Sequence, residues 1–128
     1  MTLLSGIVIT TGFLTGMWGL FHQLIVGGAV TMMHEAEERN LRIFLMTWVA
    51  HGAYISLTGF LPAILLLIYN PYEPVVLTAC ILVAIAILIL SIHVGAINYK
   101  FFITPIWIGW SLQTLHGIML VILYFVYR

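Results

Sequence analysis

Four histidines lie inside long apolar stretches of the chain, where ionisable side chains are rare. They are His22, His51, His93 and His116, one in each of four such stretches. Neutral imidazole is a common ligand of iron, copper, zinc and nickel, and it also binds the iron of haem b. Ionisable residues in such surroundings usually face the interior of a helix bundle or a cavity. The histidines are therefore the first candidates for ligands of haem b or of a transition metal.

The four histidines are expected at a similar depth in the molecule. In the first and third stretches the histidine comes shortly before the end, and in the second and fourth it comes shortly after the start. Because consecutive helices joined by short connectors run antiparallel, these positions correspond to depths of roughly 8–17 Å from one edge. The pattern predicts one histidine layer across the bundle.

Helical spacing indicates that His51 and His116 point toward the bundle interior. His51 shares one narrow polar stripe with Thr47 and Tyr54, and His116 shares a stripe with Gln113. Both histidines are followed by glycine, which leaves room for a flat macrocycle. We expect His51 and His116 to be the first ligand pair, with Thr47, Tyr54 or Gln113 orienting the ligands through hydrogen bonds.

The other two histidines have less regular surroundings. His93 lies at heptad spacing from Ala86, on a face of small residues that allows another backbone to approach closely. His22 lies about 80° from the centre of a glycine stripe that contains the packing motif Gly12-x-x-x-Gly16. We therefore rank His93 third and His22 fourth among the candidate ligands.

A purely structural role for the histidines is the alternative interpretation. Interhelical hydrogen bonds between polar side chains in a membrane contribute about 0.6 kcal/mol each on average. The chain contains neither an H-E-x-x-H nor a C-x-x-C motif. Two functions stay open: a haem-binding or metal-binding protein of electron transfer or redox sensing, and a non-catalytic accessory, assembly or structural subunit.

The segments that hold these residues are strongly apolar. Of the 128 residues, 63% are hydrophobic and 6% are charged, and the mean hydropathy is +1.18. Soluble domains contain about 25% charged residues, so the composition predicts an integral membrane protein in contact with the lipid bilayer. Zero net charge without a Lys/Arg cluster argues against nucleic-acid binding. The absence of Asp and of a Gly-x-Ser-x-Gly motif disfavours a nucleophilic enzyme. Whether the chain is an enzyme of another kind stays open.

Four apolar stretches account for nearly the whole chain. Each is long enough to cross a hydrocarbon core of about 30 Å, and none has the apolar/polar alternation of barrel strands. We therefore expect an all-α fold, with one transmembrane domain over residues 1–128 that forms a four-helix bundle in up-down-up-down order. The expected helices cover residues 5–31, 43–69, 75–97 and 105–127.

Positive charges predict the orientation of this bundle. The connectors over residues 34–42 and 98–105 contain Arg39, Arg42 and Lys100, whereas the opposite side has Arg128. The positive-inside rule then places both connectors in the cytoplasm, in a plasma or inner membrane. The outer surface of so small a bundle would be almost wholly apolar, which fits a homo-oligomer or a larger membrane complex as well as lipid.

Overall fold

All regular structure in the described part of the chain is α-helical, as expected. The computed structural model describes residues 2–31, 37–99 and 104–128. Four of the helices are long and apolar enough to cross a membrane, and α2 is a short extension of the first. The helices are α1 (Leu3–Leu24), α2 (Val26–Thr31), α3 (Glu38–Ile68), α4 (Pro74–Asn98) and α5 (Thr104–Tyr127).

The first apolar stretch forms two helices in place of the single helix expected over residues 5–31. Helix α1 starts at a Thr2 cap, whose hydroxyl accepts a hydrogen bond from the Ser5 N–H at 3.3 Å. The helix is interrupted at Ile25, where ψ is 7°. Gly27 and Gly28 follow two and three residues later, and a glycine pair weakens a helix because glycine loses more backbone entropy than other residues. The local sequence therefore interrupts a stretch that hydropathy alone reads as continuous.

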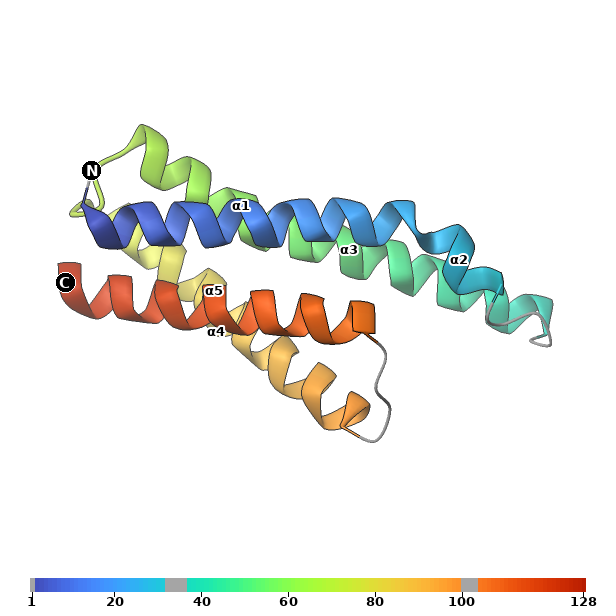
Figure 1. Cartoon of the computed structure of the whole chain (residues 1–128). Helices are drawn as coiled ribbons and strands as arrows, with labels where there is room; N and C mark the ends of the chain where they lie inside the picture. Colours follow the sequence, from blue (N-terminus) through green and yellow to red (C-terminus); the bar gives the residue numbers. More distant parts are fainter. Residues whose placement is uncertain (1, 32–36, 100–103) are drawn as a thin grey trace.

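The turn between α3 and α4 is short and closed by its own polar groups. The Asn70 side-chain oxygen accepts a hydrogen bond from the Tyr72 N–H, and the Asn70 carbonyl oxygen accepts one from the Glu73 N–H, both at 3.1 Å. Pro74 is the first helical residue of α4, a position where the missing N–H costs no helical hydrogen bond. In Figure 1 this turn lies at the same end of the molecule as both chain termini.

Glycines allow α1 and α3 to pack with their backbones in close contact. A Cβ atom at Gly59 would lie 2.6 Å from the Gly12 carbonyl oxygen and 2.9 Å from the Gly16 Cα. A Cβ at Gly52 would lie 2.9 Å from the Gly19 carbonyl oxygen. The Gly12-x-x-x-Gly16 motif is therefore part of the contact between these two helices, which run side by side in Figure 1.

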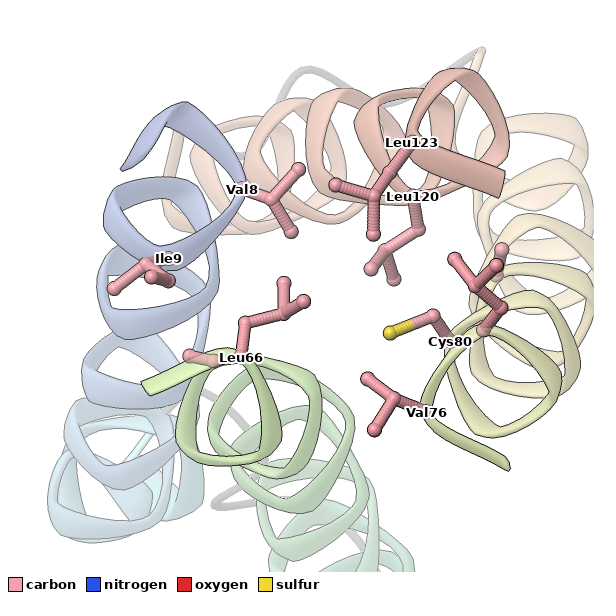
Figure 2. Close-up of a cluster of buried hydrophobic side chains, with 10 residues drawn as sticks. Val8, Ile9, Leu66, Val76, Cys80, Leu120 and Leu123 are labelled. Atoms are coloured by element: carbon pink, nitrogen blue, oxygen red, sulfur yellow. The ribbon is translucent and has the colours of Figure 1, made fainter. Parts of the chain in front are cut away.

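The apolar core lies toward the end that contains the termini. Its side chains come from α1, α3, α4 and α5, and Figure 2 shows them converging in the space between these helices. Toward the other end α4 diverges from α3 in Figure 1, while the Trp110 indole of α5 still donates a 2.8 Å hydrogen bond to the Ser91 carbonyl oxygen of α4. The labelled core residues in Figure 2 are Val8, Ile9, Leu66, Val76, Cys80, Leu120 and Leu123.

Candidate ligand-binding site

His22 of α1 and His51 of α3 lie side by side. Their ring centroids are 5.4 Å apart, and the ring planes are inclined by 37°. His22 is 8% exposed and His51 is half-buried. Their ring nitrogens form no hydrogen bond with any residue in the described ranges. Two imidazoles are therefore close together with nitrogens that are available to a ligand.

Trp48 holds the His22 ring in place. The two rings stack with their centroids 4.1 Å apart and their planes within 10° of parallel. The indole Nε1 of Trp48 also donates a 2.7 Å hydrogen bond to the backbone carbonyl oxygen of His22. Because these contacts act on both the ring and the backbone, they limit the orientations that His22 can adopt relative to α3.

A cavity of about 230 Å³ adjoins both histidines. Its walls are contributed by α1, α3, α4 and α5, and they are mostly apolar. On the α5 side Trp18 packs over Gly109, where a Cβ atom would lie 3.0 Å from the Trp18 Cδ1. Three aromatic side chains border the cavity: Trp18, Phe44 and Trp48. Its polar residues are His22, Thr47, His51 and Gln113.

A second cavity, of about 380 Å³, lies between α3 and α4, where the two helices diverge. His51 borders this cavity as well as the first, so one side chain lies between the two spaces. His93 borders the second cavity from α4. It is exposed, and its Nδ1 donates a 2.8 Å hydrogen bond to the Ile89 carbonyl oxygen of its own helix.

His116 has a different environment, enclosed between helices. Its side chain has no exposed surface, and its Nδ1 lies 3.1 Å from the Thr11 hydroxyl of α1. The ring also interacts with the backbone of Thr58 in α3, although its buried Nε2 forms no regular hydrogen bond with a described residue. The Thr58 carbonyl lacks its usual helical donor, because Pro62 four residues later has no N–H. The ring thus makes a polar contact between α5 and α1, next to the backbone of α3.

The four histidines do not form the single layer that the sequence suggests. His116 contacts α1 at Thr11, whereas His51 contacts it at His22, and along a helix these levels differ by roughly 16 Å. The structure therefore does not bring His51 and His116 together as a ligand pair. The difference arises because α3 is 31 residues long and extends beyond the start of α5, as Figure 1 shows.

The three residues expected to orient the ligands do not hydrogen-bond to a histidine ring in the described ranges. The Thr47 hydroxyl donates to the carbonyl oxygens of Ile43 and Phe44 in its own helix, at 3.0 and 2.8 Å. Tyr54 borders the second cavity. Gln113 borders the first cavity, is 2% exposed, and has a buried Oε1 to which no described residue hydrogen-bonds.

Sequence reasoning did not include Trp18 and Trp48 in the site, although both border the first cavity. A signal for them exists in the spacing. Trp18 precedes His22 by four residues and Trp48 precedes His51 by three, which places each tryptophan on the same helix face as a histidine. A tryptophan that shares a face with an intramembrane histidine is therefore a useful indicator of the site.

The described residues contain two clustered imidazoles rather than a complete metal centre. Within residues 2–31, 37–99 and 104–128, no group of three or more His, Cys, Asp or Glu side chains lies close enough to hold a metal ion. No protein-family model, curated protein or solved structure matches this chain. The functional argument therefore rests on the geometry of His22, His51 and the adjoining cavities.

Proposed function

We propose that this chain is an integral membrane protein that binds a transition-metal ion through the imidazoles of His22 and His51. The separation of their ring centroids, 5.4 Å, is the observation that carries the proposal. Two imidazoles that bind one tetrahedral ion at about 2.0–2.1 Å have ring centroids about 5 Å apart. A small adjustment of either ring would direct one nitrogen from each toward a common ion.

Haem b, the other cofactor expected from the sequence, is less well supported by this arrangement. Two axial histidines must lie on opposite faces of the macrocycle, whereas His22 and His51 lie side by side. His116 is enclosed among helices, with its Nδ1 beside Thr11. The adjoining cavity, about 230 Å³, is also smaller than the roughly 300–1,000 Å³ of typical sites for larger ligands.

The proposed metal site would have open coordination positions. Two protein ligands leave room for water or another small ligand, and imidazole nitrogen suits copper, zinc, iron and nickel. Of these metals, copper and iron change oxidation state, so the site fits electron transfer or redox sensing. The stacked Trp48 limits the movement of one ligand, and apolar walls restrict access of bulk water to the ion.

Copper binding to the full-length protein in lipid nanodiscs tests this proposal. After chelation and addition of Cu²⁺, we expect one ion per chain and an electron paramagnetic resonance spectrum with coupling to two imidazole nitrogens. His22→Ala and His51→Ala are measured separately. Each should weaken copper binding at least tenfold and leave coupling to one imidazole nitrogen.

His93→Ala is the matched control, because His93 is exposed and its Nδ1 is hydrogen-bonded within its own helix. A second control is His34→Ala, at a position outside the described residues. Both controls should retain the two-nitrogen spectrum. Equal copper affinity in all four variants, or no copper binding by the unaltered protein, would contradict the proposal.

We further propose that the helices form an up-down-up-down bundle across a plasma or inner membrane, with both termini outside. Four helices are long and apolar enough to cross, and both termini lie at one end of the molecule in Figure 1. Arg39 and Arg42 lie toward the opposite end, so the positive-inside rule supports a cytoplasmic location for that end.

Cysteine labelling tests the orientation. Cys80 is fully buried, so Cys80→Ala gives a background without thiols in which single cysteines can be introduced. We expect an impermeant thiol reagent to label Tyr72→Cys in intact cells and Glu37→Cys only after permeabilisation. Both positions are exposed in the fold, so accessibility depends on the side of the membrane. Labelling of position 37 in intact cells would contradict the orientation.

A non-catalytic accessory or assembly subunit is the second candidate function. The hydrogen bond between His116 and Thr11 favours this candidate function, because the bond gives one histidine the interhelical role that a structural subunit requires. Such a subunit would pack in a homo-oligomer or a larger membrane complex. If His22 and His51 also serve only in interhelical contacts, replacing either should cost about 0.6–1.7 kcal/mol of stability. Neither the unaltered protein nor any variant should then bind copper.

A further inference from the structure

Gln113 is a buried polar side chain without a hydrogen-bond partner among the described residues. It is 2% exposed, its Oε1 is fully buried, and its amide forms no hydrogen bond with a residue in the described ranges. An unsatisfied buried amide costs free energy, so such groups are usually paired with protein, water or a ligand. Gln113 borders the cavity beside His22 and His51, so a ligand in this cavity would lie next to the Gln113 side chain.

The cavity beside this amide and the outer cavity adjoin the same side chain. His51 borders both of them. The outer cavity lies between α3 and α4, and its α4 wall is formed largely by the apolar side chains of Ala86, Ile89 and Leu90. In Figure 1, α3 and α4 diverge toward the end of the molecule opposite the chain termini. In a membrane, an opening between two helices is accessible to molecules dissolved in the lipid.

We propose that the inner cavity binds the headgroup of a lipid-soluble quinol, whose apolar tail passes between α3 and α4. A quinol hydroxyl would donate a hydrogen bond to the Gln113 Oε1, and a quinol oxygen would accept one from an imidazole N–H of His22 or His51. The flat ring would pack against the aromatic walls of Trp18 and Trp48. This proposal stands independently of metal binding by the histidine pair.

The composition of the cavity walls favours this ligand over other lipids. Among the described residues no Lys or Arg borders either cavity, so these residues offer no countercharge to a phosphate headgroup. A single ring with two oxygens matches an inner cavity of about 230 Å³ that has a few polar groups and mostly apolar walls. A sterol has a much larger fused-ring body and only one hydroxyl group for these polar groups.

Photolabelling of the full-length protein in lipid nanodiscs tests the proposal. The probe is an azido-substituted short-chain quinone, reduced to the quinol before illumination, and the labelled peptides are identified by mass spectrometry. We expect saturable labelling of segments that border the two cavities and competition by excess decylubiquinol. Decylbenzene, which has a similar tail but no oxygens, should not compete.

Two substitutions and their matched controls locate the site. Gln113→Met keeps the side-chain volume and removes the amide, and Ala86→Phe fills the outer cavity, so each should reduce labelling at least tenfold. Thr114→Val removes a hydroxyl that bonds to its own helix, and Leu82→Phe enlarges an exposed side chain of α4, so both should label normally.

The outcomes of this experiment separate the quinol proposal from the metal proposal. Gln113→Met should retain the two-nitrogen copper spectrum while losing the quinol label, because Gln113 is not a metal ligand in our proposal. Non-saturable labelling, equal competition by decylbenzene, or unchanged labelling of either Gln113→Met or Ala86→Phe would overturn the quinol site. None of these results would affect the assignment of His22 and His51 as metal ligands.

Discussion

Gly59→Ala is expected to destabilise the protein by about 3 kcal/mol, because it separates two helices that pack through their backbones. The new Cβ atom would lie 2.6 Å from the Gly12 carbonyl oxygen and 2.9 Å from the Gly16 Cα. Neither atom belongs to a side chain that could rotate away. Alanine is otherwise more favourable than glycine inside a helix by about 0.5–1 kcal/mol. The expected loss of stability is therefore opposite in sign to the effect of helix propensity.

Gly28→Ala is the matched control for this prediction. Gly28 lies in α2, and a Cβ atom there would meet no described residue within 4 Å apart from its chain neighbours and its own helix backbone, so we expect a small increase in stability. The free energy of unfolding of both variants can be measured in bicelles by steric trapping. If Gly59→Ala is as stable as the unaltered protein, the backbones of α1 and α3 are farther apart than these distances.

The four long helices could be predicted from sequence because continuous hydropathy is a strong local signal. The α1–α3 contact could also be anticipated in part, since the Gly12-x-x-x-Gly16 motif marks a surface on which another backbone can approach. The interruption at Ile25 could not be read from hydropathy, because it occurs within a stretch that is apolar throughout and is followed by a glycine pair. Local backbone preference decides that detail.

The arrangement of the histidines was harder to predict, because it depends on how the helices are shifted along one another. Depths counted from the ends of the apolar stretches assume that all helices start at one plane. Helix α3 instead begins at Glu38 and extends beyond the start of α5, so His51 lies far from the level of His116. Such offsets follow from interhelical packing, which a single sequence does not reveal.

His22 illustrates the same difficulty at the level of a helix face. Its position about 80° from the glycine stripe suggested that it lies beside the site rather than in it. Close packing of α1 against α3 brings the flanks of the contact together as well, so His22 reaches His51 and stacks on Trp48. The rank order of the candidate ligands therefore could not be obtained from the angle alone.

His116→Ala is expected to destabilise the protein by about 3 kcal/mol, more than the loss of a hydrogen bond alone would cause. An interhelical hydrogen bond such as that to Thr11 contributes about 0.6–1.7 kcal/mol. The ring is also completely buried, so its removal leaves a cavity, and deleting a buried ring typically costs about 3–5 kcal/mol. The Thr58 carbonyl, without a helical donor because of Pro62, would lose its neighbouring imidazole as well.

The control is His93→Ala, which removes an exposed ring and should change the free energy of unfolding by less than about 0.5 kcal/mol. The same samples can be examined for copper. His116→Ala should lose stability and keep the two-nitrogen spectrum, whereas His51→Ala should lose one of the two nitrogens. If His116→Ala is fully stable and loses copper, then His116 is a ligand, and the division between a structural histidine and a metal-binding pair is wrong.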